Sequence, residues 1–502
     1  MHPNLKRWKT SLQPCGVDRL SSLPDELLSQ ILSMLPTKDV AAMQVLSKSM
    51  RRRAFTLIAC VDLEYPHLVD RFPLFNLFVD DVLHKLSQSG QPLTRFRFGI
   101  GGDKTSHICS LGKSCTHDCY GDCYPVIEPS RLSTWLSYPF VLRGLRELDL
   151  FFHVSSPSHC EVPPGIFACQ SLEVLKLDSN LKLNGAEIFP VFLPNLKLLH
   201  LRCFSIVEDF ITRLVSSCPS LEDLAVCNCW WDLSNRLIIS SHSLRRLELI
   251  IRNRDQDKYS DLVLIDTPNL QYFDYDDNLA SRYSITTMNA LIQATITIWS
   301  PLPHESNEIS LQIQLNLFRV LSNVQRLSLL YNCVENMYYG GEFKDQMPVF
   351  HHLKTLELGP NIIEARWDKL LLDILTCSPS LETLVFPEGL FVNSFSDASN
   401  PVVADLEDQG WKTKATEAIP QCLKSSLKQI VIKEYFGITR EFNLLKFFLS
   451  KASLLQELVV ICLSPPSRCH VPKNDHMLFE TTLKDSPRAS TTCLIRVVCT
   501  RT

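Results

Sequence analysis

A six-residue pattern, L-x-x-L-x-L or a close variant of it, recurs along most of this 502-residue chain and constrains the fold more than any other feature. The twelve copies begin at Leu145, Leu172, Leu196, Leu221, Leu244, Leu270, Leu291, Val324, Leu353, Leu381, Leu427 and Leu455. Most successive copies start 21 to 29 residues apart, and LTRFRF at Leu93 is a degenerate earlier copy. Periods of this length indicate stacked repeats, in which each unit buries its apolar side against its neighbours. One such array can exceed the size at which a single core stops growing.

Each copy predicts a strand that is followed by a turn and then by a helix or an irregular return. The last two apolar residues of a copy are two positions apart, so they share one face of a strand. The apolar spacing then becomes helical in residues 209–220 and 368–380. The pattern resembles a leucine-rich repeat solenoid, which implies an α/β fold with a curved parallel sheet and helices on its convex side. A doubly wound α/β domain would instead need fewer, longer units and a Gly-rich first turn.

Residues 18–55 do not follow the repeat. Pro24, Asp25 and Glu26 suit the first turn of a helix, and Pro36 ends it. Thr37 is predicted to cap a second helix. The predicted apolar stripes are Leu27, Leu28, Ile31, Leu32 and Leu35 in the first helix, and Val40, Met43, Leu46 and Met50 in the second. Two such helices cannot make a core of their own, so the solenoid or another protein must cover them.

The segment DRLSSLPDELLSQILSMLPTKDVAAMQVLSKSMRR resembles a plant F-box. It departs from that family at Ser49-Met50, where Arg-Trp is usual. The resemblance implies binding to a Skp-family adaptor of a cullin–RING ubiquitin ligase. The residues that would carry or support this contact are Leu23, Pro24, Ile31, Leu32, Leu35, Pro36, Val40 and Leu46. The alternative is that these residues are the core of a small helical cap on the solenoid.

Residues 422–460 resemble the FBD region at the C-terminus of many plant F-box/leucine-rich-repeat proteins. They predict one more strand, a helix over 441–452 and a last strand that ends the solenoid. The sequence therefore predicts an F-box at 18–60, leucine-rich repeats at 90–420 and the FBD region at 421–499.

The residues between the leucines of each copy are predicted to line the concave face of the sheet. Their chemistry varies from copy to copy, which favours a surface that binds a protein target; a generic solvated face is the alternative. Tyr272 and Arg246 are the predicted anchors, because Tyr and Arg dominate binding hot spots. The candidate target-binding residues are Lys176, His200, Arg202, Arg246, Tyr272 and Asp274.

No catalytic, metal or cofactor site is expected. Gly112-Lys113-Ser114 imitates a phosphate loop, but His107 stands where the first glycine is needed. The cluster HICSLGKSCTHDCYGDC (His107–Cys123) lacks the short Cys spacing of structural zinc sites. No nucleophile, base and orienting acid come together in any motif.

Charge and cysteine content bound the partners and the compartment. A net charge of −4 argues against nucleic-acid binding, and no apolar run approaches the 18 residues of a membrane span. The N-terminus has no secretory signal, and 19 irregularly spaced cysteines suggest reduced thiols. We expect an intracellular protein, cytoplasmic and/or nuclear, that interacts with neither membrane nor nucleic acid.

The leading hypothesis is a substrate-recognition subunit of an SCF-type ubiquitin ligase that targets proteins for ubiquitination and has no catalysis of its own. The alternatives are a non-ligase leucine-rich-repeat scaffold and a small-molecule-dependent F-box receptor.

Overall fold

The computed structural model describes most of the repeat strands and the N-terminal helices. The described residues are 19–65, 72–100, 127–136, 144–154, 162, 164–183, 191–207, 210–232, 236–251, 262–277, 283–286, 288–298, 315–331, 333, 347–359, 367–390, 419–435, 439–463 and 475–500. The chain divides into two compact units, Met1–Ser179 and Asn180–Thr502, which are taken in turn.

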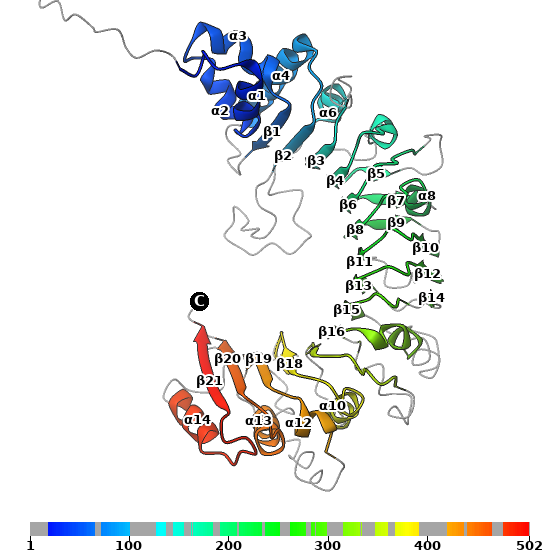
Figure 1. Ribbon diagram of the computed structural model, residues 1–502, viewed down its shortest axis with the longest axis vertical. Coiled ribbons are helices and arrows are strands. Elements are labelled where there is room, and N and C mark those ends of the chain that lie inside the picture. The colour runs from blue at the N-terminus through cyan, green and yellow to red at the C-terminus, as the bar shows by residue number, and fades with distance from the viewer. Residues whose placement is uncertain are drawn as a thin grey trace, which may run out of the picture. The chain divides into compact units, whose positions relative to one another are not determined.

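The N-terminal unit joins three short helices to a parallel sheet (Figure 1). Its elements are α1 (Asp25–Ser33), α2 (Thr37–Met43), α3 (Lys48–Leu57), β1 (Cys60–Tyr65), α4 (Phe72–Ser89), β2 (Arg95–Ile100), α6 (Pro129–Leu136), β3 (Glu147–Phe151), the 3₁₀-helix η4 (Pro164–Ala168) and β4 (Val174–Asp178). The strands pair in chain order, β1 to β2 to β3 to β4, all parallel.

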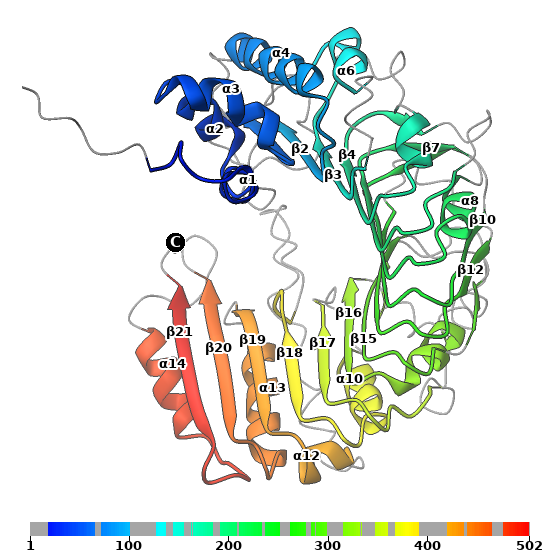
Figure 2. The ribbon, with the colours of Figure 1, turned by 45° about the horizontal axis from the view of Figure 1, so that its top comes forward.

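The C-terminal unit consists mainly of one parallel sheet in the order β6-β8-β11-β13-β15-β16-β17-β18-β19-β20-β21. These strands are β6 (Leu198–Arg202), β8 (Asp223–Cys227), β11 (Arg246–Ile250), β13 (Tyr272–Asp277), β15 (Gln293–Ile298), β16 (Arg326–Tyr331), β17 (Thr355–Leu358), β18 (Thr383–Phe386), β19 (Gln429–Tyr435), β20 (Glu457–Leu463) and β21 (Leu494–Thr500). The helices described in this unit include α8 (Phe210–Ser216), α10 (Trp367–Thr376), α12 (Gln421–Ser425), α13 (Thr439–Lys451), α14 (Asp475–Lys484) and the 3₁₀-helix η5 (Leu321–Asn323). Figure 2 shows α13 and α14 against one face of the last strands.

The leucine pattern produces the strands as predicted. Each of the twelve copies supplies one strand, and the degenerate copy at Leu93 supplies β2. In β11, Leu247 and Leu249 are buried, whereas Arg246 is exposed and Glu248 is half-buried. Leu247 is in register with Phe273 of β13 and Leu224 of β8. The apolar residues therefore stack in rows on one face of the sheet, and the polar residues form rows on the other.

The helices predicted over 209–220 and 368–380 are α8 and α10, whereas some of the other return segments form short strands. β10 (Arg236–Ser240), β12 (Leu262–Asp266) and β14 (Tyr283–Ile285) form a small parallel sheet, and β5 (Lys182–Leu183), β7 (Ser205–Val207) and β9 (Trp230–Asp232) form another. Figure 1 shows the first of these on the same side of the large sheet as α8. The segments RLIIS and LVLID are rich in Ile, Val and Leu, and β-branched residues favour extended backbone over helix.

The N-terminal helices also differ from the prediction. The second predicted helix is two helices, because α2 ends at Met43 and Ser47 caps α3 by accepting from the Met50 N–H at 3.0 Å. Thr37 is the first residue of α2 and not its cap. Its hydroxyl oxygen accepts a hydrogen bond from the Asp62 N–H of β1 at 2.7 Å, so α2 covers the outer edge of the first strand.

The cysteines of the described residues are free thiols, most of them buried among apolar side chains. Burial raises the pKa of Cys218, Cys333 and Cys422 to about 12. These three thiols therefore stay protonated at neutral pH and pack as small hydrophobes.

Candidate functional site

Two surfaces stand out, and the first is the outer surface of α1 and α2. The inner sides of α1 to α3 make a small core of Leu28, Leu32, Val40, Met50, Ala54 and Phe55. The short helices leave little room for other apolar side chains in that core. Other large apolar residues of this segment are exposed, namely Leu27, Ile31, Met34, Val45 and Leu46.

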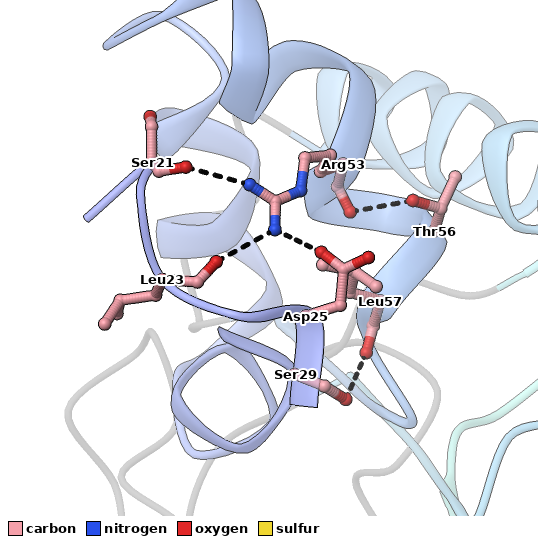
Figure 3. Close-up of polar contacts among 7 residues, drawn as sticks. All are labelled: Ser21, Leu23, Asp25, Ser29, Arg53, Thr56 and Leu57. Atoms are coloured by element: carbon pink, nitrogen blue, oxygen red, sulfur yellow. Dashed lines mark hydrogen bonds and ion pairs between the residues drawn. The ribbon is translucent and has the colours of Figure 1, made fainter. Parts of the chain in front are cut away.

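Arg53 of α3 holds the loop before α1 in place (Figure 3). Its guanidinium donates to the carbonyl oxygens of Ser21 and Leu23 at 3.0 and 3.1 Å, and it also pairs with the Asp25 carboxylate. The Ser29 hydroxyl donates to the Leu57 carbonyl oxygen at 2.6 Å and joins α1 to the end of α3. The planar fork of Arg makes several directed bonds at once, so it fixes the angle at which α1 leaves the loop.

The outward apolar residues form a stripe along α1 and a pair after α2. The stripe is Leu27, Ile31 and Met34, at helical spacing i, i+4 and i+7. These side chains are 48%, 37% and 84% exposed, and Val45 and Leu46 are 80% and 70% exposed. Exposed apolar residues that lie together on a small module indicate a surface that another protein covers.

The predicted adaptor residues divide between core and surface. Leu32 and Val40 are buried in the core of the module, so they support the helices and do not face a partner. Leu23 and Leu35 are half-buried, whereas Pro24, Ile31, Pro36 and Leu46 are exposed. The sequence analysis did not select Leu27, Met34 and Val45 for this contact. Leu27, Ile31 and Met34 have helical spacing, but the spacing does not show which side of α1 faces the core.

The second surface is the polar face of the large sheet, opposite the buried leucines. It brings together five of the six predicted target-binding residues on β6, β11 and β13, namely His200, Arg202, Arg246, Tyr272 and Asp274. Arg246 and Tyr272 are paired across neighbouring strands, and Tyr272 is 39% exposed. Lys176 is half-buried on β4 in the N-terminal unit.

Charged groups on this face are close to one another. His200 Nε2 is 3.2 Å from Asp223 Oδ1, and Arg246 Nη2 is 3.6 Å from Glu248 Oε2. Burial and the nearby charges of Glu248 and Asp276 raise the pKa of Asp274 to about 6, while Arg246 acts in the opposite direction. The single cation Arg246 therefore lies near three half-buried carboxylates, which are Glu248, Asp274 and Asp276.

Metal and membrane sites are not found in the described part of the chain. No group of three or more His, Cys, Asp or Glu residues there is placed to hold a metal ion. The His107–Cys123 cluster lies outside the described residues. No helix among those described is long and apolar enough to cross a bilayer.

Family models match three parts of the chain. An F-box domain model matches residues 20–56, and an FBD model matches residues 417–460. Between them, a model described as the LRR repeats of the FBD-associated F-box protein At5g56370 matches residues 132–295. The fold and these matches define an F-box protein with leucine-rich repeats.

Arabidopsis thaliana proteins are similar to the chain over most of its length. It is 30% identical to F-box/LRR-repeat protein At4g14103, covering 74% of this chain and 92% of that protein. It is 28% identical to F-box/FBD/LRR-repeat protein At5g56420, covering 95% and 98%. Another F-box/LRR-repeat relative, At3g49150, is 29% identical, and the match spans 66% of its length. The chain belongs to the F-box/LRR-repeat family.

Proposed function

We propose that this protein is the substrate-recognition subunit of an SCF-type (Skp–cullin–F-box) ubiquitin ligase. In this proposal the F-box binds a Skp-family adaptor, and the polar sheet face holds a protein target. The chain does no chemistry itself; it raises the concentration of the target near the ubiquitin-conjugating enzyme. The domain division at 18–60, 90–420 and 421–499 and an intracellular location, cytoplasmic and/or nuclear, belong to the same proposal.

The observation that carries the proposal is the exposed apolar stripe on the outer surface of α1 in the F-box. The core of the module is already filled by Leu28, Leu32 and the other buried side chains, yet Leu27, Ile31 and Met34 remain exposed along one side of α1. Burying a side chain of this size stabilises a complex by about 1.5–3 kcal/mol. A protein partner that covers this side gains that energy without rearranging the helices.

The test is co-purification of the chain with Skp-family adaptor, cullin and RING subunits from plant cells. The variant Ile31→Glu/Met34→Glu places two charges on exposed positions, so the fold should survive while assembly is lost. A charge at the buried Leu32 would instead unfold the module. Leu74→Glu/Leu77→Glu is the matched control, because both residues are exposed on α4 of the same unit, outside the F-box.

We expect the control to assemble like the unmodified chain and the F-box variant to lose all three subunits. If the F-box variant still assembles, the exposed side of α1 is not the contact. If the unmodified chain itself fails to assemble with the ligase, the protein is a non-ligase scaffold.

A further inference from the structure

β1 is an edge strand of the sheet in the N-terminal unit, and β21 is an edge strand of the large sheet in the C-terminal unit. The two strands differ in what covers their outer edges. At β1, the hydroxyl oxygen of Thr37 accepts from the Asp62 N–H, and α2 lies beside the strand. At β21, the pairing among the described residues is with β20 alone. Figure 2 shows β21 as the last labelled strand of its sheet, with α14 beside it. An open strand edge is a template for pairing with another chain.

The outward backbone groups of β21 follow from its register. The Leu494 N–H donates to the Gln456 carbonyl oxygen at 2.8 Å, so Leu494 bonds toward β20. Alternate residues of a strand bond in opposite directions. The N–H and C=O groups of Ile495, Val497 and Cys499 therefore point away from β20. The strand spans seven residues and has no proline or glycine to protect this edge.

Apolar side chains are more frequent on the sheet face beside this edge than on the same face of β11 and β13. The polar-side positions of β11 and β13 hold Arg246, Glu248, Tyr272, Asp274 and Asp276. On the same face, β19, β20 and β21 hold the polar residues Gln429, Glu457 and Arg496 together with the apolar strip, which consists of Val431, Val459, Ile461, Leu494 and Val498. Leu494 and Val498 are 49% and 44% exposed. The strip continues to the open edge, where an added strand would extend it.

An ion pair of Arg496 and Glu457 interrupts the strip near the edge. Arg496 lies on β21 between Leu494 and Val498, and its Nε is 3.1 Å from Glu457 Oε1. Its side chain is 60% exposed, so much of the guanidinium still faces solvent beside the open edge. An acidic side chain on an added strand would pair with it.

We propose that β21 binds an extended segment of a partner protein by strand addition. The segment carries two apolar side chains over the strip and an acidic side chain between them, next to Arg496. The pattern, apolar-x-acidic-x-apolar, is the same for a parallel or an antiparallel partner strand. This inference goes beyond the proposed ligase role and does not depend on it.

A second copy of this chain fits the edge less well. Antiparallel pairing of β21 with itself about a two-fold axis at Val497 would bring the two Arg496 side chains to diagonal positions on one face. Like charges at neighbouring cross-strand positions are destabilising. The charge therefore favours an acidic partner segment over self-association.

The first test measures binding of defined peptides to the full chain by fluorescence anisotropy. The probe is the labelled heptapeptide Thr-Val-Thr-Glu-Thr-Val-Thr, and the comparison peptide has Lys in place of Glu. We expect the Glu peptide to bind at least about tenfold more tightly, and Arg496→Glu to reverse this preference. Arg326→Glu is the matched control, because Arg326 is an exposed arginine on the same face of β16, and it should leave both affinities unchanged.

The second test removes the backbone bonds. Val497→Pro deletes one outward N–H and keeps the bonds from Leu494, Arg496 and Val498 to β20, since proline is tolerated on edge strands at such positions. Binding of the Glu peptide should fall at least about tenfold with an unchanged melting temperature. If this variant does not fold, two forms of the Glu peptide are tested against the unmodified chain. Each form carries backbone N-methyl groups along one of the two edges of the peptide strand. The form methylated on the edge that pairs with β21 must lose binding.

Three results would overturn the proposal. They are no binding of the Glu peptide, equal binding of the Glu and Lys peptides, and dimerisation of the unmodified chain that Val497→Pro abolishes. The last of these would show that a second copy occupies the edge.

Discussion

Asp274 is the residue whose surroundings most alter its chemistry. It lies half-buried on β13, close to the charges of Glu248 and Asp276, and its pKa rises to about 6 from the ordinary 3.8. Above pH 6 the folded chain therefore holds a carboxylate that is less favourably placed than in the unfolded chain. This cost decreases as the pH falls through 6 and is lost below about 3.8, where both states hold the proton. A cationic group from a bound target would also relieve it.

The variant Asp274→Asn should therefore stabilise the protein at pH 7.5 and have a smaller effect at pH 5. The expected gain in unfolding free energy at pH 7.5 is on the order of 1–2 kcal/mol, because solvent screens a half-buried group. Urea unfolding at the two pH values measures it. An equal gain at both values would show that the carboxylate is not strained by its neighbours.

At the scale of elements, the contact between α2 and β1 joins the F-box to the first strand of the sheet. Thr37 is buried, and its hydroxyl oxygen is the acceptor for the Asp62 N–H. Thr37→Val keeps the shape of the side chain and leaves this N–H without its acceptor. We expect the unfolding free energy of the N-terminal unit to fall by about 1–3 kcal/mol.

Hydrogen exchange at the Asp62 amide reports this change directly, and it should accelerate in Thr37→Val. Thr56→Val is the control, because its exposed hydroxyl donates only to the nearby Arg53 carbonyl oxygen. If Thr37→Val and Thr56→Val lowered the unfolding free energy equally, the hydrogen bond between α2 and β1 would contribute no more to stability than an exposed one.

The elements that the sequence predicted are the strands of the leucine pattern and the helices with regular apolar spacing, such as α8 and α10. Leu247 and Leu249 mark β11 because only a strand places residues two apart on one buried face. β10 and β12 were missed, since a short apolar return fits a buried helix or a strand equally well. β21 was missed because LIRVVCT lacks the leucine pattern.

Site residues were harder to predict than strands. The stripe of α1 is too wide to face one way, and sequence alone does not show that Leu28 and Leu32 turn inward while Leu27 and Ile31 turn outward. The polar sheet face was predictable, because a residue between two buried leucines must point away from them. Its register across strands depends on loop lengths that differ from repeat to repeat.

In the whole molecule, we propose that adaptor and target bind to different surfaces. Replacing both Arg246 and Tyr272 with Ala should reduce target capture at least about tenfold, which corresponds to about 1.4 kcal/mol. Adaptor binding should not change, since both residues lie in the C-terminal unit. The measurement is recovery of targets with the chain under proteasome inhibition, quantified by mass spectrometry. Unchanged recovery would place target recognition on the loops.

The central claim is that the exposed side of α1 is the adaptor-binding surface. Calorimetric titration of the purified full chain with a purified plant Skp-family adaptor tests it most directly. We expect one-to-one binding by the unmodified chain and by Leu74→Glu/Leu77→Glu, and no measurable heat from the folded Ile31→Glu/Met34→Glu variant. Binding of that variant with unchanged affinity would contradict the claim.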